Sequence, residues 1–491
     1  MSTTASTSVS DGAPTPSRAR GRRLRLGLGR EDRPFLILLA VAAVIRAATM
    51  PLYFPAVMTS MDSPRFARVN PEPIFGDQWQ PAGYAAVLKA LRVVTDEVWF
   101  TIAVQHLMGL VIGVVVYLVA RRLGASPVPA TAAAAAALLS GDVLYIEHWF
   151  MSDVLFLHVI ILTLASAVFG LVPRVDRRWL LAAGCFGAAA TLTRVVGFVA
   201  IPVVIVFAAV WVGGPWRQRL RTTGAVVAGA ALIFGGYFLA YAIKDGPHSG
   251  LTAMGGWQLY ARVAPFADCS RFEPPKGTRA LCEDTDPAKR PGVFYYTWEP
   301  SSIARQAYPD QNPETSAIVG RFAQQAILHQ PGDYALAVGT DLLRYLEPSA
   351  GIQRGYSGQP RELNSFGWRN ADVERVVTNG LEPKYDGTRV HAPGARTLGV
   401  YQQLFRVDRL ALVTALILAI FGALLLRGPI RMGVLLFGLM SLALYVAPTM
   451  TLSYDFRYGI PPGILLWTSG VLATAGLLQR RSRKPAPAPA A

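Results

Sequence analysis

The chain has 491 residues, of which 52% are hydrophobic and only 16% charged, whereas about a quarter of the residues in a soluble protein are charged. The formal net charge of +16 could indicate a nucleic-acid-binding protein. However, the arginines lie beside the ends of apolar runs rather than on one amphipathic face with aromatic neighbours, which excludes that class. The composition therefore predicts an α-helical polytopic membrane protein.

The segment before the first apolar run is rich in Ser, Thr, Ala and Pro and then in Arg. Residues 1–33 are therefore expected to be a disordered, basic cytoplasmic N-terminus. The first apolar run, 34–53, has no small-residue cleavage site, so we expect it to be a retained membrane anchor rather than a signal peptide.

Ten apolar runs are long enough, or nearly so, to cross a bilayer as helices. Two of them, 128–145 and 179–193, are short and are expected to be thin or partly buried helices. We expect about ten transmembrane helices, in an N-terminal module over 34–243 and a C-terminal module over 407–478. The ten runs are 34–53, 97–120, 128–145, 153–173, 179–193, 195–213, 222–243, 408–426, 430–448 and 458–478.

The distribution of arginine predicts which helix ends face the cytoplasm. Arginine gathers at the N-terminus and in every second connector, where the positive-inside rule places the cytoplasm. We therefore expect the protein in the cytoplasmic membrane, with both termini in the cytoplasm. The C-terminal end is the basic Pro-Ala tail 479–491. The first loop, 55–96, and a large polar, mixed domain, 244–406, are expected outside.

Two arginines, Arg194 and Arg457, lie beside connectors that this topology places outside. A cation at the outer headgroup depth usually has an anionic partner. The partner could be a bound phosphate, or each arginine could be a structural ion pair or a snorkelling side chain. The residues alone leave these alternatives open.

The first outer loop combines an acidic segment with an amphipathic one. Asp62 follows the first apolar run closely, so it is expected near the membrane surface. Pro81 suits the first turn of a helix. An interfacial helix over 82–95 is predicted because four residues share one helical face. They are Tyr84, Val87, Leu88 and Leu91.

The second outer connector places Glu147, His148 and Asp153 beside several aromatic residues. These side chains have the chemistry of metal ligands, but their spacing matches no known metal motif. A metal site and a hydrogen-bonded polar cluster therefore both remain open.

The polar domain 244–406 carries no catalytic signature. Helical patterns appear over 313–330 and 331–346. Cys269 and Cys282 are the only cysteines of this domain, and in an oxidising compartment they are expected to form a disulfide, with two free buried thiols as the alternative. The second helix has an apolar set that could form a buried stripe: Tyr334, Leu336, Val338, Leu342, Leu343 and Leu346.

Four local patterns of the chain belong together. They are Asp62 to Phe66, Pro81 to Tyr84, Glu147 to Asp153, and the arginine motifs Thr191 to Arg194 and Phe456 to Pro461. Together they resemble the GT-C glycosyltransferases, the group of the protein O-mannosyltransferases and the lipid A aminoarabinose transferase. The chain departs from the patterns of this group at Ser63, in place of the Glu of a common Asp-Glu pair, and at Gln80-Pro81-Ala82, in place of His-Pro-Pro. These departures leave the metal requirement and the sugar open.

The resemblance implies an inverting enzyme that transfers a sugar from a polyprenyl-phosphate donor to a hydroxyl of an envelope polysaccharide, lipid or protein. It implies Asp62 as the general base, with Asp153 as the rival. No cofactor is certain, and a divalent metal is possible. A transporter or flippase is the alternative, in which polar residues would line a path through the bundle centre. The expected substrate-binding residues are Arg65, Tyr84, Glu147, His148, Asp153, Arg194, Arg457 and Tyr458.

Overall fold

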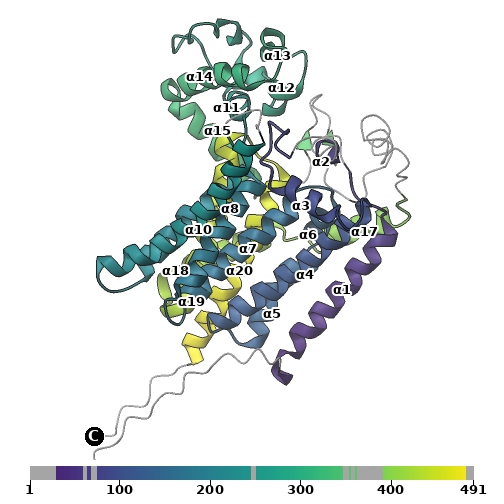
Figure 1. Ribbon diagram of the computed structural model, residues 1–491, viewed down its shortest axis with the longest axis vertical. Coiled ribbons are helices and arrows are strands. Elements are labelled where there is room, and N and C mark those ends of the chain that lie inside the picture. Colours follow the sequence, from purple (N-terminus) through teal and green to yellow (C-terminus); the bar gives the residue numbers. More distant parts are fainter. Residues whose placement is uncertain are drawn as a thin grey trace, which may run out of the picture.

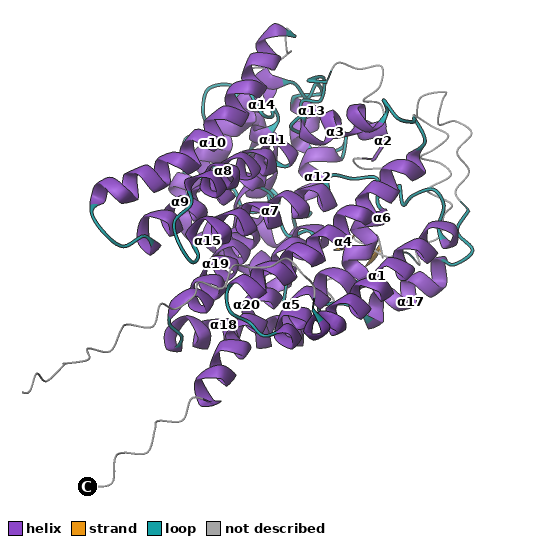
Figure 2. Cartoon of the chain, turned by 60° about the horizontal axis from the view of Figure 1, so that its bottom comes forward, coloured by secondary structure: helices purple, strands orange, loops and turns teal. Residues whose placement is uncertain are grey.

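The computed structural model describes the chain as an almost wholly helical molecule (Figure 2). The strands that it describes are β1 (Gln353–Arg354) and β2 (Pro360–Arg361), which form one short antiparallel pair. The described residues are 29–58, 63–67, 74–244, 250–346, 353–354, 360–361, 366 and 391–482.

A bundle of long helices forms the larger part of the molecule, and a small helical domain lies on one end of it (Figure 1). We call this end of the bundle the domain end and the opposite end the far end. In the bundle, α8 packs along α7 and α10, while α18 and α19 both pack on α20. The bundle helices are α1 (Arg33–Leu52), α4 (Val98–Arg122), α5 (Pro127–Leu139), α6 (Gly141–His148), α7 (Asp153–Leu171), α8 (Arg177–Thr193), η2 (Val195–Val199), α9 (Ala200–Trp211), α10 (Trp216–Ile243), α18 (Arg409–Leu425), α19 (Gly428–Thr451) and α20 (Phe456–Ser482).

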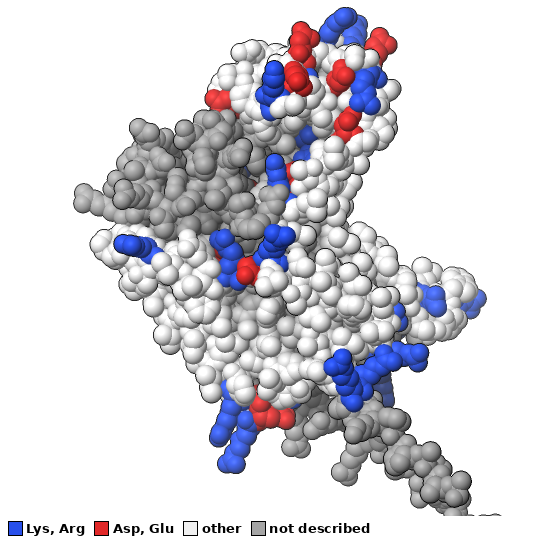
Figure 3. All heavy atoms as spheres, turned by 180° about the vertical axis from the view of Figure 1, so that it is seen from behind, with Lys and Arg blue, Asp and Glu red and all other residues white. Residues whose placement is uncertain are grey.

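Each of the ten predicted apolar runs lies in this bundle, which confirms a polytopic helical membrane protein. Seven described helices are long and apolar enough to cross a membrane, and the bent pair α5 and α6 would make an eighth. The remaining two, α8 and the segment Val195–Trp211, are shorter, so the number of about ten is approximate. Charged side chains on the face shown in Figure 3 leave a broad uncharged belt across the bundle, as a bilayer requires.

The run 128–145 is not one straight helix. It bends by 45° between α5 and α6, at Ser140. The break lies against α17 (Ala395–Leu404), because the backbone N–H of Gly141 donates to Phe405 O at 2.9 Å. A Cβ at Gly141 would lie 3.0 Å from the Gln402 nitrogen, so glycine allows this close approach. The bend turns α6 toward the domain end.

Two short helices of the first loop lie at the domain end. They are α2 (Ser63–Ala67) and α3 (Gly83–Leu91), so the predicted interfacial helix is present but shorter than 82–95. Tyr84 and Leu88 on its apolar face are both 1% exposed. The buried face therefore agrees with the predicted stripe.

The small domain has its own hydrophobic core, built around aromatic residues such as Trp257, Tyr260 and Phe322. The predicted disulfide between Cys269 and Cys282 is present, with a Cα separation of 5.8 Å. The predicted helices over 313–330 and 331–346 are confirmed as α14 and α15. The helices of this domain are α11 (Gly255–Val263), α12 (Val293–Trp298), α13 (Ile303–Ala307), α14 (Pro313–His329) and α15 (Pro331–Arg344).

The prediction of a buried stripe on α15 is wrong for two of its residues. Leu336 is 71% and Leu343 64% exposed. The helix packs instead through the face that carries Asp341, whose carboxylate pairs with Arg262 of α11 and accepts the backbone N–H of Tyr454 at 3.1 Å. The buried ion pair between Asp341 and Arg262 thus lies on the covered face of α15.

Candidate functional site

The main polar cluster at the domain end joins three residues that are far apart in the sequence. Asp153 is the first residue of α7, Arg194 directly follows α8, and Arg457 is the second residue of α20. Arg194 Nη1 donates to Asp153 Oδ1 at 2.6 Å, and Arg457 Nη1 lies 3.9 Å from Asp153 Oδ2. All three are buried, with Arg194 the most exposed at 7%. The two arginines that break the positive-inside pattern thus share one carboxylate.

Aromatic rings and a second carboxylate hold the Arg457 guanidinium in place. Its Nη2 is 3.4 Å from Asp455 Oδ2, and the backbone N–H of Arg457 donates to Asp455 Oδ1 at 2.9 Å. The guanidinium carbons of Arg457 and Arg194 lie over the Tyr458 ring at 5.6 and 4.9 Å, and Arg457 also lies over Trp149 at 5.1 Å. Two arginines therefore face two carboxylates, so the cluster is formally neutral.

Glu147 belongs to a second buried cluster, together with Arg46 of α1 and His106 of α4. Arg46 Nη2 donates to Glu147 Oε1 at 2.6 Å, and His106 Nδ1 lies 2.9 Å from Glu147 Oε2. Arg46 Nη1 also donates to Leu138 O at 2.8 Å, close to the break between α5 and α6. This arginine therefore satisfies a carbonyl that the broken helix leaves without its helical partner.

The cluster continues through His148 to the backbone of Tyr53. His106 Nε2 is 3.0 Å from His148 Nδ1, and His148 Nε2 is 2.5 Å from Tyr53 O. A carbonyl only accepts, so His148 Nε2 donates, and neutral His148 must accept at Nδ1 from His106. The remaining contact then requires one further proton, carried by either His106 or Glu147.

These contacts place the polar residues of the connector in two separate clusters. Glu147 and His148 belong to a hydrogen-bonded cluster, whereas Asp153 faces Arg194 and Arg457. Within the described ranges, no group of three or more His, Cys, Asp or Glu could hold a metal ion.

Tyr84 links the first loop to both clusters. Its hydroxyl donates to Gln105 Oε1 at 2.7 Å, and Gln105 Nε2 donates to the carbonyls of Glu147 and Trp149, both at 2.8 Å. Gly83, just before it, packs directly on α8, since a Cβ there would lie 2.9 Å from the Thr193 nitrogen. The start of α3 thus positions the segment that ends in Arg194.

Two of the predicted site residues lie apart from these contacts or cannot be placed. Arg65, in α2, has its Nε 3.8 Å from Asp77 Oδ2. Asp62, the expected general base, lies outside the described residues. Its role therefore stays a prediction.

Sequence reasoning missed Arg46, His106 and Arg406 as members of these networks. Arg406 Nε donates to Asp142 Oδ2 at 3.0 Å, and Gln402 Nε2 donates to Asp142 Oδ1 at 3.0 Å, which fixes the start of α6. Arg46 and His106 had a usable signal, because ionisable residues inside membrane-spanning runs are rare and often functional. Arg406 had none, since it lies in a long polar segment.

A cavity of about 420 Å³ lies on the other side of the Asp455 segment, between α18, α19 and α20. Tyr454 and Phe456, which flank Asp455, line it. Arg406 also lines the cavity, and its guanidinium carbon lies 5.0 Å from the centre of the Phe456 ring. Gly459 packs closely on the Tyr345 ring, and Gly463 leaves room beside α20, so the cavity extends along the first two turns of this helix.

Residues 80–238 match the family model described as dolichyl-phosphate-mannose-protein mannosyltransferase. The matched segment runs from the residue before Pro81 into α10 and includes Tyr84, Asp153 and Arg194. It is less than half of the chain. No curated protein matches the chain significantly.

Among solved structures, the chain is similar to the archaeal oligosaccharyltransferase AglB from Archaeoglobus fulgidus in complex with an inhibitory peptide and a dolichol-phosphate. The identity is 12% and the TM-score 0.44, and the match covers 91% of this chain and 50% of that chain. It is also similar to ArnT from Cupriavidus metallidurans bound to undecaprenyl phosphate, with 16% identity, a TM-score of 0.37 and coverage of 91% and 78%. The chain thus spans about half the length of the oligosaccharyltransferase. Residues 80–238 are thus similar to the dolichyl-phosphate-mannose-protein mannosyltransferases, and the protein O-mannosyltransferases are one of the groups that the motifs of the chain resemble.

Proposed function

We propose that this protein is a membrane glycosyltransferase that moves a sugar from a polyprenyl-phosphate donor to an acceptor hydroxyl at the domain end. We place this end on the outer face of the cytoplasmic membrane, with both termini in the cytoplasm and an envelope polysaccharide, lipid or protein as the acceptor. The observation that carries the proposal is the convergence of Arg194 and Arg457 on Asp153.

The two guanidinium groups suit the phosphate of the donor. Arginine makes paired, charge-assisted hydrogen bonds to phosphate oxygens, and burial strengthens them. The cluster is neutral, so an entering phosphate must replace a carboxylate as counter-ion. Of the two contacts to Asp153, that of Arg457 is the longer, at 3.9 Å against 2.6 Å for Arg194. We therefore expect Arg457 to release Asp153 before Arg194 does, while it keeps its contact with Asp455.

The proposed reaction is a single displacement at the anomeric carbon. The acceptor oxygen attacks this carbon from the side opposite the phosphate, its proton passes to a carboxylate, and the bond between sugar and phosphate breaks. The electron pair remains on the lipid phosphate, where the arginines stabilise the developing charge. One displacement inverts the anomeric configuration. Asp62 is the proposed base, and Asp153 is its rival.

The cavity beside α20 offers a place for the isoprenoid chain. It borders the Asp455 segment, and its walls include Leu412, Ile460 and Ile464 as well as several tyrosines. A lipid entering there would keep its chain among apolar side chains while its phosphate lay at the level of Arg457. The family match to a dolichyl-phosphate-dependent transferase supports the same class of donor.

A transporter or flippase is the alternative function. The bent pair α5 and α6 and the buried Arg46 are features that transporters also use. However, both clusters lie at the domain end, and Tyr84 and Gln105 join them there. This arrangement favours chemistry at one face of the membrane.

The test is an assay of the purified protein in liposomes with a panel of polyprenyl-phosphate sugars and radiolabelled acceptors from the envelope. We expect sugar transfer from at least one donor, and its loss in the double variant Arg194→Ala/Arg457→Ala with the fold retained by circular dichroism. Movement of a fluorescent lipid-linked sugar across the bilayer without any transfer would instead establish the transporter.

A further inference from the structure

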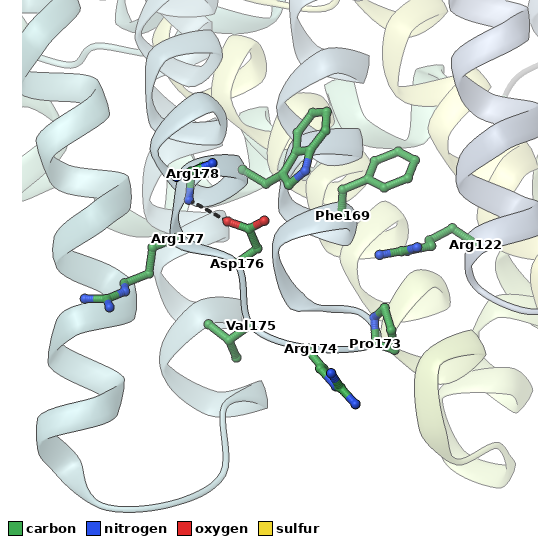
Figure 4. Close-up of a pocket in the computed structure, with 9 residues that line it drawn as sticks. Arg122, Phe169, Pro173, Arg174, Val175, Asp176, Arg177 and Arg178 are labelled. Atoms are coloured by element: carbon green, nitrogen blue, oxygen red, sulfur yellow. Dashed lines mark hydrogen bonds between the residues drawn. The ribbon is translucent and has the colours of Figure 1, made fainter. Parts of the chain in front are cut away.

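A second cavity, of about 640 Å³, lies at the far end of the bundle, away from the site described above. Its walls are the end of α4, the end of α7 and the first turn of α8, with the connector between α7 and α8 (Figure 4). All three helix ends lie at the boundary of a membrane-spanning segment, which is headgroup depth. The lining residues are Arg122, Phe169, Pro173, Arg174, Val175, Asp176, Arg177, Arg178 and Trp179.

Four arginines and one aspartate line this cavity, so its lining has a net charge of about +3. Asp176 is already engaged as the cap of α8, because its Oδ1 accepts the backbone N–H of Arg178 at 3.0 Å. Among the described residues, no carboxylate lies within salt-bridge distance of any of the four guanidinium groups. The cavity is therefore a strongly positive concave surface without a protein counter-ion in the described part of the chain.

Contacts hold Arg122 and the backbone of the connector in place. Arg122 Nε donates to Val172 O at 2.8 Å, and its guanidinium carbon lies 5.3 Å from the centre of the Phe169 ring. The Asp176 backbone N–H donates to Gly170 O at 2.9 Å, which folds the connector back on α7. Figure 4 shows Arg122 pointing from α4 toward this connector. Arg122 therefore loses little conformational entropy when it binds an anion, whereas the side chains of Arg174, Arg177 and Arg178 are exposed and can close on the anion from the connector side.

The aromatic residues indicate that the anion is part of a lipid. Phe169 and Trp179 lie with ring centroids 5.2 Å apart, and Trp179 is 45% exposed. Tryptophan at headgroup depth contacts the glycerol region and the upper acyl chains. Basic pockets between transmembrane helices bind the headgroups of anionic lipids. A free phosphate ion would make no use of the aromatic wall.

We propose that the cavity between α4, α7 and α8 binds the phosphate of an anionic phospholipid headgroup in the membrane leaflet at the far end. This site is independent of the glycosyltransferase reaction proposed above. Its ligand is a membrane phospholipid, and it lies at the end of the bundle opposite the Arg194 and Arg457 cluster.

The basic connectors of any membrane protein attract anionic lipids weakly, so the test needs a matched control. Arg217 and Arg219 lie in the first turn of α10, at the same end of the bundle, and line neither cavity described here. The cavity variant is Arg174→Gln/Arg178→Gln, and the control is Arg217→Gln/Arg219→Gln. Both variants remove two exposed arginines, so folding is expected to persist in each.

The measurement is the affinity of the full-length protein for phosphatidylglycerol, by native mass spectrometry and by thermal shift in mixed micelles, with phosphatidylcholine as the neutral probe. Each arginine that contacts the bound headgroup contributes about fivefold, so the cavity variant should bind phosphatidylglycerol about 25-fold more weakly, whereas Arg217 and Arg219 make no such contact. The control should stay within about twofold of wild type. Unchanged melting temperatures in phosphatidylcholine verify the fold of both variants.

Three results would overturn the proposal. Equal losses in the two variants would mean that surface charge alone attracts the lipid. Equal affinity of the wild type for phosphatidylglycerol and phosphatidylcholine would mean that the cavity recognises no anion. Binding of inorganic phosphate with the same dependence on Arg174 and Arg178, but no preference for the anionic lipid, would make this a site for a soluble phosphate compound.

Discussion

Arg194 and Arg457 are the residues on which the proposed donor site depends, and each is buried against a carboxylate and an aromatic ring. The sequence distinguished them because they break the alternation of basic connectors. It did not reveal that they share Asp153, because residues 153, 194 and 457 come together only when α7, α8 and α20 are packed. Each arginine thus has an anionic partner within the protein, and the cluster that they form with Asp153 and Asp455 is neutral.

The first prediction concerns the shape of the guanidinium group. Arg457→Lys and Arg194→Lys keep the positive charge but lose the planar fork and the stacking on Tyr458. Each change should lower kcat/KM for the lipid-linked donor by roughly tenfold or more. Steady-state kinetics in detergent, with the donor that the liposome assay selects, measure this effect. Lysine variants with wild-type kinetics would refute paired recognition of the phosphate.

The second prediction separates the two candidate bases. Asp62→Asn keeps the size of the side chain but removes the base, so turnover should fall by about 100-fold or more while donor affinity stays near normal. Asp153→Asn removes the counter-ion of Arg194 and should change donor affinity as well as turnover. Single-turnover rates and donor titrations of both variants distinguish these effects. If Asp62→Asn keeps substantial turnover and a folded Asp153→Asn is inactive, the role of the base passes to Asp153.

At the scale of elements, α3 and α20 position the site through glycine contacts. Gly83 brings the start of α3 against the end of α8, and Gly463 keeps one face of α20 open. The sequence predicted α3 from its apolar stripe but gave no indication that it contacts α8. Such contacts depend on how each helix is rotated and shifted in the bundle.

The third prediction tests the contact between α3 and α8. In Gly83→Ala the new Cβ meets the backbone of Leu192 and Thr193, which cannot move aside as a flexible side chain would. Overpacking of this kind costs about 1–3 kcal/mol, so we expect a lower melting temperature and reduced turnover. Gly224→Ala, in α10, is the control, because nothing lies within 4 Å of a Cβ there. Equal melting temperatures and turnover in the two variants would show that the contact between α3 and α8 contributes to neither stability nor activity.

The fourth prediction tests whether the cavity beside α20 holds the isoprenoid chain. In Gly463→Leu the side chain grows into this cavity, where the atoms nearest a new Cβ are Tyr445 Oη at 3.5 Å and Leu412 Cδ2 at 3.6 Å. We expect KM for the lipid-linked donor to rise about tenfold, because about 1.4 kcal/mol of apolar contact would be lost, with kcat little changed. Gly236→Leu, on the exposed face of α10, is the control. An unchanged KM would place the chain elsewhere.

At the scale of the whole molecule, the chain divides its polar groups between the two ends of an apolar bundle. The domain end holds the two buried clusters, and the far end holds the basic cavity around Arg122. The orientation of this molecule in the membrane rests on the arginine pattern of its connectors. The proposed function requires the domain end to face outward.

The fifth prediction concerns this orientation. Single cysteines at Ser301, in the α11–α15 domain, and Gly213, in the connector before α10, are placed in a Cys185→Ser background. A maleimide that cannot cross the membrane should label the cysteine at 301 in intact cells, and the one at 213 only after the cells are opened. The native Cys269 and Cys282 remain unlabelled because they form a disulfide. The reverse pattern would invert the topology and remove the basis for an outward-facing site.

The sequence alone determined the helices of the bundle, the disulfide and the two exceptional arginines. A helix that crosses a bilayer needs a long apolar run, so composition and run length suffice to find most of them. The pair Cys269 and Cys282 followed because no other cysteine lies in the same polar domain. Asp62, in the first outer loop, was singled out by its motif, and its role as the general base stays a prediction.

Only the tertiary structure decided which charged groups meet. Asp153 lies in a different cluster from Glu147 and His148, although these residues are close in sequence. Glu147 pairs instead with Arg46 and His106, which lie on other helices. The tertiary structure also broke the run 128–145 at Ser140 and turned Leu336 and Leu343 of α15 outward. The physical reason is that side-chain pairing depends on the rotation and register of each helix. Those are fixed by contacts between segments far apart in the chain, which no local pattern records.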